Sequence, residues 1–249
     1  MGEARKKTKK TTKKAVGRAI PARPSGRDTL QDRVLARLQH ALMSGIFIPG
    51  QILSLRKVAT SFGTSSMPVR ESFSRLIAAR ALEELPNRTV RVPKLSRTEL
   101  IELFEVRRLV EGMATRIASE RADEFVIAEL KAINDELLLA LRDKKMDTVL
   151  AANQKFHFAM YRAANSGILM PLIENLWLRC GPTMYYALNS PDNSWDSSLH
   201  IEVLRALKRG DVSRVCEAMV ADISVSGDYL IGLAAKQPRS GPFASLSLT

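Results

Sequence analysis

Apolar residues between positions 29 and 82 recur with the period of short amphipathic helices. In the first predicted helix, which begins near Thr29, they follow the spacing i, i+4, i+7, i+8, at Val34, Leu38, Ala41 and Leu42. The same spacing returns in a third helix, at Val69, Phe73, Leu76 and Ile77. A short second helix is expected over residues 54–63, because a serine caps its start and a glycine ends it.

The period changes after Leu82. Residues 85–92 predict a strand, a turn and a strand, with Val90 and Val92 on one face and Arg91 on the other. Three short helices followed by a hairpin are typical of a winged helix-turn-helix. We expect this unit to occupy residues 28–96.

The remainder of the chain is almost wholly helical in pattern. Ser96 is expected to cap the first of its helices, and the predicted helices cover residues 97–121, 123–143, 146–164, 167–188, 194–208 and 211–235. No repeat of 20 to 50 residues is evident, so an all-helical bundle over residues 97–236 is favoured over a solenoid. The predicted fold class is mainly α, with tails at residues 1–27 and 237–249.

Charge is distributed unevenly along the chain. The total is +12, of which residues 1–27 contribute +9, residues 28–96 contribute +5 and residues 97–249 contribute −2. The basic first segment is either a solvated tail or an arm that adds phosphate contacts without reading sequence. Two cysteines without C-x-x-C spacing predict neither a disulfide framework nor a thiolate zinc site. No long apolar run and no signal-peptide pattern is present, so a cytoplasmic protein without membrane contact is expected.

The third helix of the head is expected to read DNA. In a helix-turn-helix the second helix of the motif enters the major groove, so polar and basic residues near its start must lie off the apolar stripe. Arg70 is the best candidate for a bidentate guanine contact or a phosphate clamp. The predicted DNA-binding residues are Arg56, Ser65, Ser66, Met67, Arg70, Arg75, Asn87 and Arg88. A helical domain with merely solvated arginines would give the same pattern without the wing.

The head resembles the GntR family of bacterial transcription regulators. The resemblance rests on residues 45–53 (GIFIPGQIL), 65–76 (SSMPVRESFSRL) and 85–88 (LPNR). It implies a homodimer that binds double-stranded operator DNA, with repression favoured by analogy. The chain departs from the family at Ser66, where an arginine usually contacts DNA, and at Thr89, where a glycine is common. Its operator is therefore expected to differ from the usual one.

The helical half resembles the effector domain named FCD, which occurs in regulators related to FadR. The shared landmarks are residues 105–107 (EVR), Glu111, residues 156–157 (FH), 164–165 (AN) and 199–200 (LH). The resemblance implies a small organic acid as effector and a divalent metal (Zn, Ni or Mn) held by three His and one Asp. The corresponding positions here are Asn153, His157, His200 and Asp222, so two of the four ligand types are altered.

Several alternatives stay open at this stage. The two histidines could be hydrogen-bonded core residues, and a pocket without metal is equally consistent with the pattern. Arg107 could bind the effector carboxylate or pair with Glu111, which is four residues away. Weaker pocket candidates are Trp177, Arg179, Tyr185 and Tyr186. The rival functions are a metal-dependent enzyme that uses His157, His200 and Asp222, for which no catalytic spacing is present, and an RNA-binding or acidic-partner protein.

Overall fold

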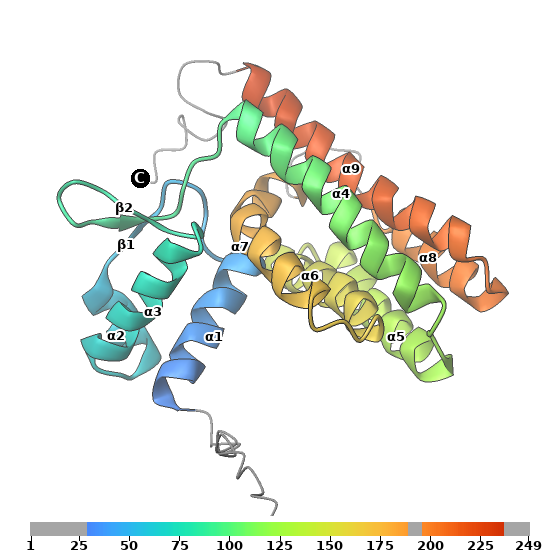
Figure 1. Ribbon diagram of the computed structural model, residues 1–249, viewed down its shortest axis with the longest axis horizontal. Coiled ribbons are helices and arrows are strands. Elements are labelled where there is room, and N and C mark those ends of the chain that lie inside the picture. The colour runs from blue at the N-terminus through green and yellow to red at the C-terminus, as the bar shows by residue number, and fades with distance from the viewer. Residues whose placement is uncertain (1–28, 189–195, 237–249) are drawn as a thin grey trace, which may run out of the picture.

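A computed structural model describes residues 29–188 and 196–236 of the chain (Figure 1). The described residues form a small head joined to a larger helical bundle. The elements of the head are α1 (Leu30–Met43), β1 (Ile52–Leu53), α2 (Leu55–Phe62), α3 (Ser66–Ala78), β2 (Glu83–Glu84) and β3 (Val90–Arg91). The predicted tails at residues 1–27 and 237–249, and the predicted start of a helix at residue 194, lie outside the described residues.

Helix boundaries in the head follow from local capping chemistry. The Thr29 side chain accepts from the Asp32 backbone N–H, and Asp32 in turn accepts from the Thr29 backbone, which makes a capping box at the start of α1. Ser54 caps α2, and Gly63 ends it in the left-handed conformation that glycine adopts without strain. The three predicted helices of the head are therefore confirmed.

The sheet of the head has one more strand than the sequence pattern predicted. Its order is β1-β3-β2, and both pairings are antiparallel. The prediction that the first hairpin strand starts at Leu85 was wrong, because β2 ends at Glu84 and Leu85 already belongs to the turn. β1 was missed because a strand of two residues shows no periodicity; it is identified only by its pairing with β3.

The bundle consists of α4 (Arg97–Ser119), α5 (Glu124–Arg142), α6 (Met146–Ala163), α7 (Leu169–Leu188), α8 (Ser198–Arg209) and α9 (Val212–Lys236). α4 and α9 run side by side in opposite directions along one edge of the molecule (Figure 1). Fully buried apolar side chains from α4, α5, α6, α7 and α9 form its core. Five of the six predicted bundle helices have bounds within two residues of the observed ones. The exception is the fifth, predicted over residues 194–208, because α8 begins at Ser198.

The C-terminal part of α1 packs against α7, and this contact joins the head to the bundle. At Gly181 the backbone of α7 approaches the backbone of Leu42 and Met43 too closely to leave room for a side chain. A glycine is required wherever two backbones come this near. The head is thus attached to the bundle by direct helix packing as well as by the chain segment after β3.

α9 is the one helix in the described part of the chain that is long and apolar enough to cross a membrane. It also carries Asp222, whose side chain is buried. Of its most apolar window, 44% is buried inside the protein, where it packs against α4 and α8.

Candidate DNA interface and buried ligand site

α3 presents its predicted DNA-binding residues to solvent. Pro68, Val69, Phe73 and Leu76 are buried, which leaves the opposite face of the helix outward. Met67 is 68% exposed, and Ser65, Ser66 and Arg70 are also exposed. Arg75 pairs with Glu71 at 3.4 Å on the helix surface, an exposed pair of small energetic value. Arg56 lies exposed in the first turn of α2.

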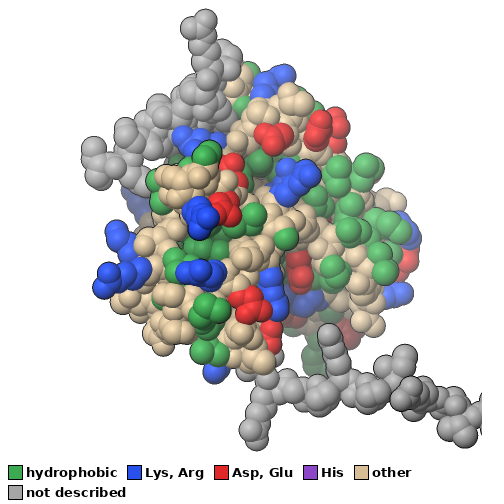
Figure 2. Space-filling view, turned by 60° about the vertical axis from the view of Figure 1, so that its left-hand side comes forward, with side chains coloured by type: hydrophobic (Ala, Val, Ile, Leu, Met, Phe, Trp, Pro, Cys, Tyr) green, Lys and Arg blue, Asp and Glu red, His purple; other side chains and the backbone are tan. Residues whose placement is uncertain are grey.

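A cleft of about 720 Å³ separates α3 from the wing, which is the hairpin of β2 and β3. Arg70 and Ser74 line it from α3, and Arg88 and Thr89 line it from the wing. Two arginines that are distant in sequence thus face the same concave surface. Lys and Arg side chains are spread over the face of the molecule that holds the head (Figure 2). Guanidinium groups on either side of a groove are suited to phosphate and base-edge contacts.

The tip of the wing holds Arg88 in an uncommon backbone conformation. Its φ is +61°, in the left-handed region that residues other than glycine rarely adopt. Asn87 accepts a hydrogen bond from the Thr89 N–H at 3.0 Å, and Leu85 N–H bonds to the Thr89 carbonyl at 2.8 Å. The turn therefore projects the Arg88 side chain at the expense of some strain.

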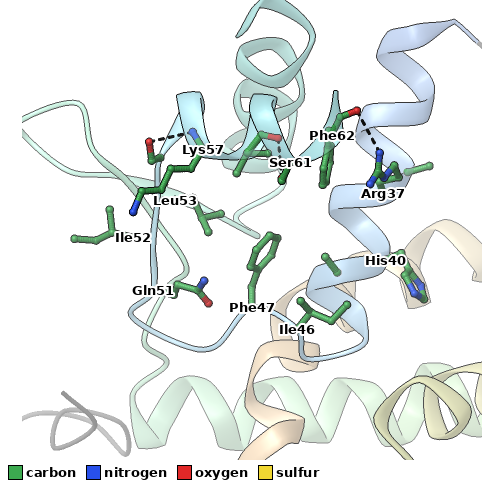
Figure 3. A pocket seen from close by; sticks show the side chains of 14 residues that line it. Arg37, His40, Ile46, Phe47, Gln51, Ile52, Leu53, Lys57, Ser61 and Phe62 are labelled. Carbon is green, nitrogen blue, oxygen red and sulfur yellow. Dashed lines mark hydrogen bonds between the residues drawn. The ribbon is translucent and has the colours of Figure 1, made fainter. Parts of the chain in front are cut away.

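The head has a second concave surface, an apolar groove of about 750 Å³ between α1, β1 and α2. The Phe47 ring points into it, and Ile46 and Ile52 lie along its rim (Figure 3). The Arg37 guanidinium stacks on the Phe62 ring at 4.0 Å. Among the residues that line this groove none belongs to α3, so it is separate from the cleft that holds Arg70.

The bundle brings together His157, His200 and Asp222, from α6, α8 and α9. Their side chains are at most 4% exposed, and their candidate ligand atoms all lie within 4.8 Å of one another. His157 Nε2 is 3.0 Å from Asp222 Oδ2, and His200 Nε2 is 3.7 Å from the same oxygen. The Phe156 ring stacks on His200 with the centroids 4.0 Å apart. The structure thus brings three of the four predicted ligands together, with both histidines next to the Asp222 carboxylate.

Burial and charge act in opposite directions on these groups. Burial alone would raise the pKa of Asp222, but His200 and the hydrogen bond from His157 outweigh it and hold the pKa well below its usual value. Burial lowers the pKa of His200, and Asp222 offsets only part of that change. The pocket therefore favours an ionised carboxylate and a neutral His200 imidazole, which is the form that binds a metal.

Arg107 forms a buried ion pair with Glu111, the alternative that the sequence left open. Its Nε lies 2.7 Å from Glu111 Oε1 and its Nη2 lies 3.3 Å from Oε2. The guanidinium also sits over the rings of Phe104 and Trp177, at 4.9 and 4.8 Å. Only Nη1 has no hydrogen-bond partner among the described residues. Arg107 is thus mainly a core residue, with one buried donor to spare.

Asn153 lies one turn before His157 on the same side of α6. It is 2% exposed, and its Oδ1 has no hydrogen-bond partner among the described residues. An unpaired buried amide oxygen is costly unless something satisfies it. Two imidazoles, one carboxylate and this oxygen form a donor set that suits Zn, Ni or Mn. The residues present therefore fit a divalent metal.

Sequence reasoning missed Tyr161, which contacts His157, and it did not find the partner of Trp177. Tyr161 is fully buried and its hydroxyl lies 2.9 Å from His157 Nδ1. Trp177, a weak candidate at first, donates its indole N–H to Glu111 Oε2 at 3.0 Å. The spacing of four residues between His157 and Tyr161 was an available signal, because it places both on one helical face. In the described part of the chain, the predicted pocket residues Arg179 and Tyr185 make no hydrogen bond or ring contact with His157, His200 or Asp222.

A winged helix-turn-helix joined to a helical bundle with a buried polar site is the architecture of a DNA-binding regulator with a ligand domain. The family model for bacterial regulatory proteins of the gntR family matches residues 30–92, and the FCD domain model matches residues 102–224. The chain belongs to the GntR family and carries an FCD domain. Like the relatives it resembles, it is a transcription regulator and not an enzyme.

Two relatives from Escherichia coli K12 align over most of the chain. The HTH-type transcriptional regulator McbR is 33% identical over 190 residues, which cover 75% of this chain and 85% of McbR. The HTH-type transcriptional repressor RspR is 26% identical over 190 residues, which cover 75% of this chain and 81% of RspR.

Solved structures show the same fold. E. coli McbR/YncC superposes with a TM-score of 0.74 at 28% identity and covers 85% of this chain and 99% of its own. A GntR regulator from Rhodococcus sp. RHA1 superposes with a TM-score of 0.68, at 22% identity, and covers 81% and 97% of the two chains. At that identity the second comparison supports the fold alone.

Proposed function

We propose that this chain is a cytoplasmic homodimeric repressor that binds a palindromic operator through α3 and the wing, with residues 28–96 as DNA-binding domain and residues 97–236 as effector domain. The observation that carries the DNA part is the cleft lined by Arg70 and Arg88. A two-fold dimer requires two half-sites about one helical turn apart, because each recognition helix fills one major groove. Repressor names among the relatives, such as RspR, favour repression.

The effector of the proposed repressor is a small organic acid that binds with a divalent metal in the bundle. Asn153, His157, His200 and Asp222 would hold the metal, which when bound supplies a cationic centre for the carboxylate of the acid. The support is the buried donor set with its unsatisfied Asn153 oxygen. Arg107 can contribute only Nη1 to the acid, since its other donors are committed to Glu111. Metal and acid both bind where water is excluded, which strengthens their attraction.

α7 provides the physical connection between this site and the head. Trp177 belongs to the hydrogen-bond network around Glu111, and Gly181, one turn later, lies against Leu42 and Met43 of α1. A shift of α7 upon ligand binding would move α1 and so change the distance between the two heads of the dimer. Such coupling is reciprocal, so the operator would change effector affinity by the same factor.

The DNA part is tested with Arg70→Ala, measured against operator DNA recovered from a random-sequence selection. We expect a loss of about 1 to 3 kcal/mol in specific binding, with little loss on non-specific duplex. Arg142→Ala is the matched control, because Arg142 is also exposed but lies at the end of α5 in the bundle. Operator affinity that is unchanged in Arg70→Ala would contradict the assignment of α3.

The site in the bundle is tested by metal analysis of protein purified without chelator or metal resin, beside His157→Ala and His200→Ala. We expect one divalent metal for each wild-type chain and none in the variants. A thermal-shift screen of small carboxylic acids on the metal-loaded protein then identifies the effector class. Wild-type protein that takes up no Zn, Ni or Mn would remove the metal from the proposal and leave a direct ligand site.

A further inference from the structure

We propose that Tyr161 and Glu111 are positioning residues that fix the orientation and the proton of His157, so that His157 Nε2 faces the cation of the site. This inference rests on the metal part of the proposed function. It concerns residues that are not themselves ligands. The three side chains form a buried hydrogen-bonded chain from α4 through α6, with Glu111 at one end and His157 at the other.

Glu111 determines the direction of this chain. Its side chain is fully buried and accepts from Arg107 Nε and Nη2, from Trp177 Nε1 at 3.0 Å and from the Tyr161 hydroxyl at 2.7 Å. A carboxylate paired with arginine in this way can only accept hydrogen bonds. The single proton of the Tyr161 hydroxyl must therefore point to Glu111.

The Tyr161 oxygen is consequently left as an acceptor for its other neighbour. The phenol holds its proton in the hydrogen bond to the Glu111 carboxylate, 2.7 Å away. His157 Nδ1 lies 2.9 Å from the oxygen, at hydrogen-bond distance. Since the oxygen has no second proton to give, the proton between them belongs to Nδ1.

The position of the Nδ1 proton affects the other ring nitrogen of His157, Nε2. With Nδ1 directed to Tyr161, the other ring nitrogen, Nε2, is directed at Asp222 Oδ2, 3.0 Å away. A proton or a metal cation at Nε2 satisfies the Asp222 oxygen, and binding of a metal displaces that proton. Ligand histidines in metal sites commonly donate their other ring N–H to a carboxylate or a water, which fixes the tautomer. Here a tyrosine hydroxyl stands between the imidazole and the carboxylate.

The test begins with metal-free protein, so that it does not depend on metal binding. Long-range ¹H–¹⁵N spectra of ¹⁵N-histidine protein distinguish a ring protonated at Nδ1 from one protonated at Nε2. We expect Nδ1–H for wild-type His157 and a shift toward Nε2–H in Tyr161→Phe, where Nδ1 has lost its acceptor and Asp222 attracts the proton. Tyr185→Phe, which removes a hydroxyl elsewhere on α7, keeps the wild-type spectrum. An unchanged His157 signal in Tyr161→Phe overturns the inference.

A second variant reverses the direction of the hydrogen bonds between Glu111, Tyr161 and His157 without removing the tyrosine. In Glu111→Gln the side-chain amide can donate to the Tyr161 oxygen, which turns the Tyr161 proton toward His157 Nδ1. The expected result is again a move to Nε2–H. If Glu111→Gln fails to fold because Arg107 loses its partner, Tyr161→Phe alone decides, since phenylalanine fills the same volume.

The metal measurement uses Trp177, whose ring centroid is 5.3 Å from that of His157, as a fluorescence reporter. The other tryptophan, Trp195, lies outside the described residues and is replaced by phenylalanine in every sample. Titration with Ni²⁺ should show an affinity about 10- to 100-fold weaker in Tyr161→Phe than in its parent, with Tyr185→Phe unchanged. Equal affinities in Tyr161→Phe and its parent contradict the inference. If the parent binds no Ni²⁺, the metal proposal fails, and the histidine spectra still decide the role of Tyr161.

Discussion

Gly181 of α7 lies so close to Met43 of α1 that a Cβ atom added to the glycine would be 2.6 Å from the Met43 Cα. The obstructing atoms belong to backbone and cannot rotate aside. Trp177, which precedes Gly181 by one turn of α7, bonds to Glu111 in the bundle. A single helix therefore contacts both the polar network of the bundle and the first helix of the head.

Gly181→Ala should destabilise the protein by about 1 to 3 kcal/mol, because the added methyl group forces two packed backbones apart. Gly232→Ala in α9 is the matched control: it is the same change in a helix, at a position with no atom within 4 Å of the added carbon. There the higher helix propensity of alanine should raise stability, by up to about 1 kcal/mol. Urea unfolding of both variants checks this, and a Gly181→Ala protein as stable as wild type would show that the contact is loose.

Arg88 should show opposite effects on stability and on DNA binding. Its φ of +61° costs a side chain about 1 kcal/mol or more, a cost that glycine does not have. Arg88→Gly should therefore raise the unfolding free energy by about that amount while weakening operator binding. Arg88→Ala loses the same charge but keeps the strain.

The comparison of the two Arg88 variants separates charge from strain. Both should bind DNA more weakly and show a smaller dependence of affinity on salt, because one phosphate contact is gone. Only Arg88→Gly should gain thermal stability. Equal stability of the two variants would mean that the wing relaxes, and full operator affinity in both would remove Arg88 from the interface.

The start of α4 depends on a capping box between Ser96 and Glu99. The Ser96 hydroxyl caps the Glu99 N–H, and Glu99 accepts from the Ser96 N–H at 2.8 Å. Ser96→Ala should cost about 1 kcal/mol. Ser65→Ala is the control, since Ser65 occupies the same position before α3 but makes no side-chain capping bond. It should leave stability nearly unchanged.

The capping box also predicts a dependence on pH. The backbone hydrogen bond from Ser96 lowers the pKa of Glu99 in the folded protein, burial opposes this in part, and the Ser96 hydroxyl lowers it further. A group with a depressed folded pKa stabilises the protein above its unfolded pKa of about 4.3 and loses that contribution as the pH falls through the folded value. The stability difference between wild type and Glu99→Gln, which removes the charge that titrates, should therefore be full at neutral pH and shrink below about pH 4. A difference that stays constant down to pH 3 would contradict this role of Glu99.

Much of the fold could be predicted because it is determined by local sequence. The side chains of Thr29, Ser54 and Ser96 each accept a hydrogen bond from the backbone N–H three residues later and so cap a helix. Gly63 ends α2 because its φ is positive. The apolar stripes of α1 and α3 recur at fixed spacing for the same reason. β1 has no such local signal, because its two residues are defined by partners in β3.

The ligand site also contains residues that the sequence could predict and contacts that it could not. The spacing of Asn153 and His157 could be read from the chain, and the resemblance to FCD domains supplied His200 and Asp222. The sequence also offered the pairing of Arg107 with Glu111, but the hydrogen bonds of Tyr161 and Trp177 to Glu111 could not be predicted. Tyr161 and Trp177 lie 50 and 66 residues from Glu111 in sequence and meet it only in the packed core. Periodicity identified Trp177 as a core side chain but not the carboxylate that its indole contacts.

Asn153→Asp should strengthen metal binding at the cost of stability without metal. The new carboxylate would lie one helical turn from His157, the partner of Asp222, and two buried like charges repel, so the metal-free variant should unfold more easily than wild type. A divalent cation removes that repulsion and gains an anionic ligand in place of an unsatisfied amide oxygen. We expect Ni²⁺ or Mn²⁺ affinity to rise by about tenfold or more, which corresponds to 1.4 kcal/mol, and the thermal shift on metal addition to exceed that of wild type.

Asn134→Asp provides the control for this change. Asn134 is also 2% exposed and its Oδ1 likewise has no hydrogen-bond partner among the described residues, but it belongs to α5, a helix that contributes none of His157, His200 and Asp222. It should be destabilised by its buried charge to a similar degree, and added metal should not restore it. Calorimetric titration and thermal unfolding of both variants, with and without metal, distinguish the two positions. If metal rescues both variants or neither, Asn153 does not face the metal site, because only a carboxylate within reach of the cation can convert repulsion into binding energy.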